Sequence, residues 1–100
     1  MPFMIFYHPK VIEEDWPRLD SSVRIRIRRA IEQRLMTEPA YYGKPLRHRW
    51  KGHWKLRVGD YRVIYAVLES RVLVVVIGHR RDIYATSPSR LTWHPSSVSN

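Results

Sequence analysis

Five side chains of this sequence are the main candidates for catalytic chemistry: Lys55, Arg57, Arg62, Arg80 and Tyr84. An arginine presents a planar fork of N–H donors that matches two oxygens of a phosphate group. A lysine or a tyrosine adds a group that can orient or take up a proton. Brought together, side chains of these types would stabilise negative charge on a phosphodiester and assist a proton transfer there.

The spacing of three of these residues places them on one face of a strand pair. Two strand-like segments flank Gly59-Asp60, a dipeptide that predicts a two-residue hairpin turn. In that register Arg57 lies opposite Arg62, and Lys55 lies two positions along on the same face. Like charges directly opposed on two strands repel. The pair therefore predicts an anion bound between the two arginines.

The next hairpin brings the following residues to the same place. With Glu69-Ser70 as a two-residue turn, Ile77 is expected opposite Arg62. Residues 79–81 then lie beside the basic patch, and Tyr84 follows within reach. The sequence thus predicts one cluster drawn from positions almost thirty residues apart. A generic basic sheet face with a structural tyrosine is the plainer interpretation.

The net charge of the chain indicates the kind of partner that it binds. The chain has 18 Lys and Arg against 9 Asp and Glu, a net charge of +9. Residues 1–38 contribute +1 (7 − 6) and residues 39–100 contribute +8 (11 − 3). Fourteen of the 18 cations are arginine, the residue suited to phosphate contacts and to stacking. We therefore favour a nucleic-acid partner over a charge surplus that serves only solubility.

The elements that must position the cluster follow from hydrophobic period and from breaker residues. A short strand is expected over residues 3–7 and a short helix over residues 10–16. Asp20 or Ser21 can cap a second helix that runs to about Thr37. Its buried stripe consists of Val23, Ile27, Ile31 and Leu35. We interpret the arginines on its remaining surface as a solvated face rather than an RNA contact.

The rest of the chain completes an α+β two-layer sandwich. Residues 40–52 have no clear period and predict a loop, and strands are expected over 54–58, 61–68 and 72–77. The architecture is therefore one N-terminal strand, two helices and an antiparallel β-meander with the helices on one face. We assign residues 1–84 to a single domain and residues 85–100 to a Ser/Pro-containing C-terminal tail, which Trp93 is positioned to pin to the domain.

Several classes of protein are disfavoured. The absence of cysteine removes disulfide scaffolds and thiolate zinc sites. The histidines show no ligand spacing, so neither a metal nor another cofactor is expected. The longest apolar runs are six residues, too short to cross a bilayer. The N-terminus lacks the basic leader of a signal peptide. We expect a cytoplasmic protein with no membrane partner.

Three blocks of this sequence together resemble the RelE family of toxin–antitoxin systems. They are Pro45-Leu46-Arg47, the run from Trp54 to Tyr65, and the run from Ile77 to Tyr84, and the resemblance covers about residues 3–84. It implies a RelE-like fold and a ribosome-dependent endoribonuclease that cuts mRNA in the ribosomal A site. It also implies a cognate antitoxin, expected to be acidic, that wraps the toxin.

The resemblance also implies roles for single residues. Arg62 would stabilise the transition state, and Arg80 would lie at the leaving group. Tyr84 would orient or deprotonate the 2′-hydroxyl or stack on a base, and Lys55 would hold the phosphate or act as the base. The RNA-binding candidates are Arg47, Lys51, Arg57, His79 and Arg81.

Two histidines leave the roles open. His79 is a second candidate for the general acid beside Arg80, although a structural, hydrogen-bonded histidine is more common at a strand end. His53 stands where the family pattern has a further basic residue, and Lys51 is the nearby cation that could compensate. The general base stays open between Lys55 and Tyr84.

Two other functions fit part of this pattern. A ParE-type toxin, which inhibits DNA gyrase without nuclease activity, would have the same fold. A non-catalytic RNA- or ribosome-binding protein would keep the charge but would not need a reactive cluster on one sheet face. The combination of Arg62, Arg80 and Tyr84 favours cleavage.

Overall fold

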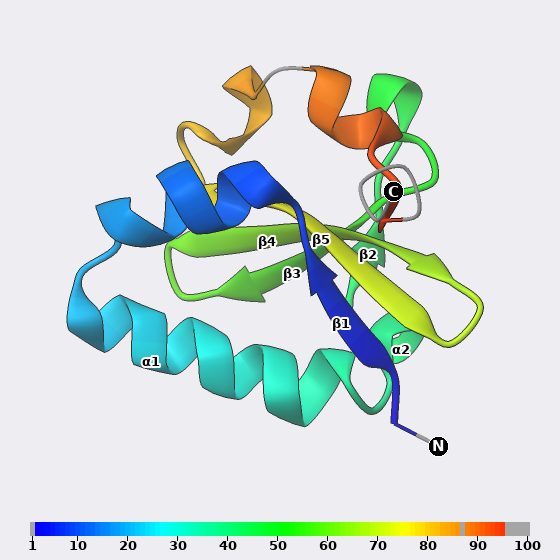
Figure 1. The fold of residues 1–100 in the computed structure, drawn as a ribbon, viewed down its shortest axis with the longest axis horizontal. Helices are drawn as coiled ribbons and strands as arrows, with labels where there is room; N and C mark the ends of the chain where they lie inside the picture. The colour runs from blue at the N-terminus through cyan, green and yellow to red at the C-terminus, as the bar shows by residue number, and fades with distance from the viewer. Residues whose placement is uncertain (1, 87, 96–100) are drawn as a thin grey trace.

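The computed structural model of the chain describes residues 2–86 and 88–95, which form one five-stranded sheet with helical segments around it (Figure 1). The strands lie side by side in the order β1 Met4–Tyr7, β5 Arg71–His79, β4 Tyr61–Leu68, β3 Trp54–Val58 and β2 Lys44–Pro45. β1 is parallel to β5, and the other neighbours are antiparallel. The predicted α+β fold is confirmed.

The main helix, α1, covers Ser21–Ala30 and continues as a wider π-type turn over Ile31–Leu35. Asp20 caps it, because its carboxylate accepts a hydrogen bond from the Val23 N–H at 3.0 Å. The predicted apolar stripe is confirmed and faces the sheet. Its fully buried members are Ile27, Ile31 and Leu35.

The other helical segments are short. They are a π-type turn over Val11–Asp15, a 3₁₀ turn over Trp16–Arg18, α2 over Pro39–Tyr42, and 3₁₀ turns over His48–Trp50, Ile83–Ala85 and Pro88–Thr92. Pro17 lies in the first turn of its segment, where its missing N–H breaks no hydrogen bond. Each of these segments is five residues or shorter, so none forms a second long helix beside α1.

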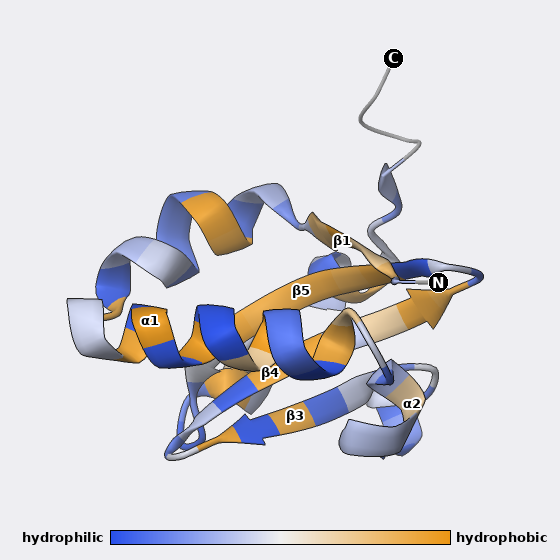
Figure 2. Cartoon of the chain, turned by 90° about the horizontal axis from the view of Figure 1, so that it is seen from below, coloured by the Kyte–Doolittle hydropathy of each residue, from blue (hydrophilic) through white to orange (hydrophobic). Residues whose placement is uncertain are grey.

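The face of the sheet toward α1 forms the larger core. Figure 2 shows α1 lying across the sheet, with β5 almost wholly hydrophobic and β3 alternating between hydrophobic and hydrophilic residues. The predicted inward residues of the β3–β4 hairpin belong to this core, among them Leu56, Val58, Val63 and Tyr65. The period of two along β3 therefore leaves Lys55 and Arg57 on the other face.

The opposite face is not bare, contrary to the expectation of helices on one face alone. A second core cluster lies there, formed by Trp50, Ile64, Val75, Val76 and Ile83 with Leu46, Leu91 and Trp93 packed against it. Both central strands therefore bury residues on their two faces, which accounts for the continuous apolar run of β5.

The predicted loop over residues 40–52 contains regular structure. Its first residues belong to α2, and β2 pairs Lys44 with Lys55 and Pro45 with Trp54. A strand of two residues leaves no readable period, so pattern alone cannot find it. It covers only the first part of β3 and leaves the edge from Leu56 onward without a strand partner.

Part of the predicted tail packs on the body. The Arg90 side chain is buried and donates two hydrogen bonds to the Asp15 carboxylate, at 2.6 and 3.1 Å. Leu91 and Trp93 pack on the second core cluster, and the Trp93 ring lies 5.3 Å from that of His8. Residues 87 and 96–100 of the tail lie outside the described residues. Within the described part of the chain, no helix is long and apolar enough to span a bilayer.

Candidate RNA-binding and reaction site

The β3–β4 hairpin has the predicted register. Arg57 is paired with Arg62, and Lys55 is paired with Ile64. These side chains share the face opposite α1, where Arg57 is exposed and Lys55 and Arg62 are partly buried. The structure adds Lys44, which is paired with Lys55 on the same face. Four cations therefore share this face, as the pair Lys44–Lys55 on β2 and β3 and the pair Arg57–Arg62 on β3 and β4.

Arg62 and Arg80 meet at the Gly59–Asp60 turn. One nitrogen of Arg62, Nη1, donates to the carbonyls of Gly59 and Tyr61, both at 2.9 Å. The Arg80 backbone N–H donates to the Asp60 carbonyl at 2.8 Å, and Arg80 Nε lies 3.9 Å from Asp60 Oδ1. The carbonyls offset part of the repulsion expected from the Arg57–Arg62 pair. Among the described residues, no other hydrogen bond or ion pair involves the Arg62 guanidinium, so its remaining nitrogens are available to a phosphate.

The predicted neighbour of Arg62 on β5 is wrong by one residue. The β4–β5 register shifts between Ile64 and Tyr65, so that Gly78 rather than Ile77 faces Arg62. The cause is a bulge, in which β5 has one residue more than β4 between two paired positions. The predicted turn at Glu69-Ser70 is confirmed by the pairing of Leu68 with Arg71, but a bulge has no signature in this apolar run.

The bulge also decides where His79 lies. His79 is paired with Tyr61, and the two rings lie 5.4 Å apart. Tyr61 packs against the core on the α1 side of the sheet, so His79 lies on that side and not with Arg62. His79 Nδ1 accepts a hydrogen bond from the Arg81 N–H at 3.2 Å. The structure thus separates His79 from the cluster in which the sequence places it.

Tyr84 lies with a neighbouring loop on the face of the cluster. Its ring packs edge-on against Trp50 at 5.5 Å, and Trp50 belongs to the same cluster as Ile64, which shares its face with Lys55. Tyr84 is 40% exposed, so the residue is open to contact with a substrate. Within the described part of the chain Tyr84 contacts this loop, and a bound substrate is needed to connect it to Arg62.

Arg49 is a residue that the sequence reasoning missed. Its Nη2 donates to the Tyr84 carbonyl at 2.8 Å, and its guanidinium lies 5.6 Å from the centre of the Trp50 ring. It therefore ties the Tyr84 segment to the loop before β3. The only sequence signal was its place between Arg47 and Lys51, in a loop with several other cations.

The remaining residues predicted to bind RNA are exposed. Arg47, Lys51 and Arg81 lie at the surface. Among the described residues, the only ion pair formed by the predicted catalytic and RNA-binding cations is Arg80 with Asp60. A surface this rich in unpaired cations can hold a polyanion, and arginines at Gly59–Asp60 can hold one phosphate of it. No group of three His, Asp or Glu side chains among the described residues could hold a metal ion.

His53 is too deeply buried to bind a substrate, because only 9% of its surface is exposed. Its backbone holds the loop: its N–H donates to the Trp50 carbonyl, and its carbonyl accepts from the Leu46 N–H. Burial lowers the pKa of its imidazole, against smaller raising contributions from hydrogen bonds to the backbone of Lys51 and Leu91. A charged imidazole is therefore disfavoured in the folded protein.

This burial predicts a loss of stability in mild acid. The unfolded chain titrates His53 near pH ~6.5, above the folded pKa, so it binds more protons at acid pH. The stabilisation is present above pH ~6.5 and is lost as the pH falls through the folded pKa. Urea unfolding of His53→Gln should change less than wild type between about pH 7.5 and about pH 5.5. The exposed control His48→Asn should follow wild type, and equal pH dependence in His53→Gln would contradict the assignment.

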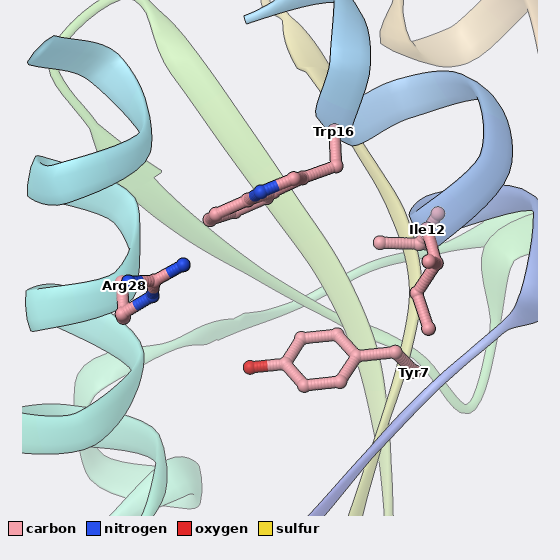
Figure 3. A pocket seen from close by; sticks show the side chains of 5 residues that line it. Tyr7, Ile12, Trp16 and Arg28 are labelled. Carbon is pink, nitrogen blue, oxygen red and sulfur yellow. The ribbon is translucent and has the colours of Figure 1, made fainter. Parts of the chain in front are cut away.

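A separate hollow lies between the segment after β1 and α1 (Figure 3). Tyr7, Ile12, Trp16 and Arg28 line it together with Val11, and the Arg28 guanidinium lies 5.4 Å from the centre of the Trp16 ring. Burial raises the pKa of the Tyr7 phenol, with a further rise from Glu32 and a smaller lowering by Arg28. None of the predicted site residues lines this hollow.

The chain resembles known proteins in sequence and in fold. A family model described as the ParE toxin of the type II toxin–antitoxin system parDE matches residues 5–84. Toxin RelG and toxin RelE of Mycobacterium tuberculosis are each 40% identical to it, over 52 and 58 residues, or 50% and 56% of this chain. The match spans 60% of the length of each relative.

Solved structures agree with the fold. A chain of the toxin–antitoxin complex RelBE2 from Mycobacterium tuberculosis superposes with a TM-score of 0.71 at 24% identity, covering 80% of this chain and 100% of that one. A mutant of E. coli toxin RelE in the free state gives 0.68 at 21% identity, covering 90% and 98%.

Proposed function

The chain belongs to the ParE toxin family of type II toxin–antitoxin systems, and we propose that it cuts mRNA on the ribosome as a metal-independent endoribonuclease. The observation that carries the proposal is the meeting of Arg62 and Arg80 at one exposed turn, on the sheet face that also presents Lys55 and Tyr84. The 40% identity to two toxins named RelG and RelE supports the ribonuclease branch of the superfamily.

The proposed reaction is an in-line displacement at phosphorus. The 2′-oxygen attacks the adjacent phosphate, its proton passes to Lys55 or Tyr84, and the bond from phosphorus to the 5′-oxygen breaks. The products are a 2′,3′-cyclic phosphate and a 5′-hydroxyl, whose proton comes from Arg80 or from water. Arg62 stabilises the charge that develops on the phosphate oxygens. Since His79 lies on the α1 side, it does not serve as the acid in this scheme.

The site is incomplete without a bound substrate. The ring of Tyr84 packs edge-on against Trp50, away from any contact with the Gly59–Asp60 turn among the described residues. A correctly oriented mRNA has to bring its 2′-hydroxyl to Tyr84 while its phosphate lies on Arg62, and positioning of that kind is worth several orders of magnitude in rate. This need favours a reaction that depends on the ribosome to hold the substrate.

We also propose an acidic antitoxin as partner. The similar structures include the RelBE2 toxin–antitoxin complex and an E. coli RelBE toxin–antitoxin complex. A net charge of +9 and an exposed basic face favour an acidic chain that associates faster at low salt. Coexpression with the product of the neighbouring gene should yield a tight complex in the cytoplasm.

Gyrase inhibition is the second candidate, since the matching family model is that of ParE. A ParE-type gyrase inhibitor needs no cluster of nuclease residues. A non-catalytic protein that binds RNA or ribosomes would leave both the mRNA and DNA supercoiling unchanged. The three functions therefore separate by product: cut mRNA, relaxed DNA, or neither.

The test is in vitro translation with reverse-transcription mapping of the mRNA. We expect cuts only where ribosomes are present, and 5′ ends that a kinase labels without prior phosphatase treatment. Cleavage should persist when a chelator is added at a level that leaves the ribosomes intact. Intact mRNA together with inhibited gyrase supercoiling would replace this proposal with the ParE function.

A further inference from the structure

A groove rich in arginine lies between α1 and the free edge of β3. It has a volume of about 420 Å³ and is lined by Arg26, Arg29, Ala30, Gln33, Arg34, Arg57, Val58 and Gly59. The helical lining residues recur at intervals of three and four, so they share one face of the helix. The arginines of α1, expected to form a solvated face, therefore form one wall of a concave surface.

Arg57 forms part of the opposite wall because β3 is an edge strand there. β2 pairs with β3 at Trp54 and Lys55, and no strand in the described part of the chain covers the following residues on this side. Arg57 is exposed at this edge and is one of the residues that line the groove. Two elements far apart in the sequence thus contribute arginines to the lining of one hollow.

The charge of this groove is not neutralised within the described chain. None of its four arginines forms an ion pair with a described residue, and no acidic side chain lines it. Arg34 instead lies over the Tyr42 ring, 5.9 Å from its centre. Four like charges that converge repel one another, and a ligand with several negative charges relieves that repulsion.

We propose that this groove binds the phosphodiester backbone of a nucleic-acid duplex, as a second site beside the reaction site. Arginine forks match phosphate oxygens. Duplexes are held through their backbones, whereas recognition of single strands relies on aromatic stacking. No aromatic residue of the described ranges lines the groove, so these ranges give it no stacking platform.

An acidic protein is the weaker fit. Stable protein interfaces have an apolar centre that supplies most of the binding energy. Of the residues that the structure describes, Ala30 and Val58 are the only apolar ones that line this groove. Carboxylates of a partner would therefore meet arginines but would have no apolar anchor.

The groove adjoins the reaction site at one turn. A Cβ on Gly59 would lie 2.7 Å from Arg26 Nη2, and the Gly59 carbonyl accepts a hydrogen bond from Arg62 Nη1. One turn therefore separates the two sites, and Arg57 lies at the boundary. A folded RNA held in the groove would present a neighbouring strand to Arg62. Binding in the groove itself does not depend on cleavage.

The test measures binding of the full chain to labelled duplexes by fluorescence anisotropy over a salt series. The probes are an RNA duplex of about twenty base pairs, a DNA duplex of the same length, single-stranded RNA and polyglutamate. The groove variant is Arg26→Gln/Arg29→Gln/Arg34→Gln. The control, Lys10→Gln/Arg18→Gln/Arg71→Gln, removes the same charge from positions outside the groove.

The groove variant should bind duplexes about ten- to hundredfold more weakly than the control. Its slope of log affinity against log salt should be shallower by about two to three, since each phosphate contact contributes about 0.7–0.9. Gln33→Glu, which adds a negative charge to the groove without removing an arginine, should weaken duplex binding in the same direction. A stronger effect on RNA than on DNA would identify RNA as the duplex.

Equal duplex binding by the groove variant and the control would overturn the inference, as would a groove-dependent affinity for polyglutamate that equals the affinity for duplexes. Circular dichroism of both triple variants shows whether each is folded. If the groove variant is not folded, the duplex affinity of Gln33→Glu relative to wild type tests the inference instead. The outcome is separate from that of the proposed function. Wild-type protein that cuts no mRNA but binds duplexes through the groove refutes the first proposal alone.

Discussion

Arg62→Gln should lower the rate of ribosome-dependent mRNA cleavage by about 100- to 1,000-fold, because one donor aimed at a developing oxyanion is typically worth that much. The substitution removes the charge and the fork, while the side chain keeps similar polarity. Single-turnover cleavage at saturating ribosome concentration measures the effect on the chemical step. The loss should appear in kcat and not in KM, since other cations hold the RNA backbone.

Arg71→Gln is the matched control for this experiment. Arg71 lies at the far end of β5 and forms an exposed ion pair with Glu69 at 3.3 Å, so its loss should leave cleavage unchanged. If Arg62→Gln cleaves at the wild-type rate, the Gly59–Asp60 turn is not the reaction site.

The effect of Arg62→Gln on stability should be small, in contrast to its effect on rate. Removing a directly opposed like charge relieves about 0.2–1 kcal/mol. The variant also loses the hydrogen bonds from Arg62 to the Gly59 and Tyr61 carbonyls, each worth about 0.5–1.5 kcal/mol. From the sequence alone only the first term is visible, and it predicts a gain. With both terms we expect a free energy of unfolding close to that of wild type.

Arg90→Met should destabilise the fold by about 3–5 kcal/mol, because it leaves a buried carboxylate without its partner. Asp15 is 6% exposed and Arg90 is 7% exposed. The Asp15 carboxylate also accepts from the Ile77 N–H at 3.0 Å, and Arg90 Nη1 donates to the Val75 carbonyl at 3.1 Å. The pair therefore satisfies backbone groups of β5 where β1 has already ended. Urea unfolding of the variant measures the loss.

The double variant Asp15→Asn/Arg90→Met tests the cause. Asparagine keeps an acceptor for the Ile77 N–H but carries no charge, so the double variant should be more stable than Arg90→Met alone. Lys10→Gln breaks the exposed pair with Glu14 and should leave the free energy of unfolding nearly unchanged. A double variant as unstable as Arg90→Met would show that packing of the C-terminal segment, rather than the buried charge, carries the effect.

Local rules were sufficient for the β3–β4 hairpin. Its dipeptide turn, its alternation and its strand ends together predict the pairing of Arg57 with Arg62, because a two-residue turn leaves only one register. The stripe of α1 and its Asp20 cap are equally local, since they depend on residues three and four positions apart. The hairpin contains Lys55, Arg57 and Arg62, so the first half of the candidate site was predictable.

The second half required the tertiary structure. The bulge in β5 moves Gly78 opposite Arg62 and turns His79 to the α1 side, and an unbroken apolar run gives no sign of it. Arg49 meets Tyr84 across 35 residues, and Arg90 meets Asp15 across 75. The arginine groove likewise needs α1 to lie beside an edge that β2 leaves uncovered. Sequence patterns report neighbours along one element, whereas these contacts depend on how separate elements pack, and only the folded chain decides that.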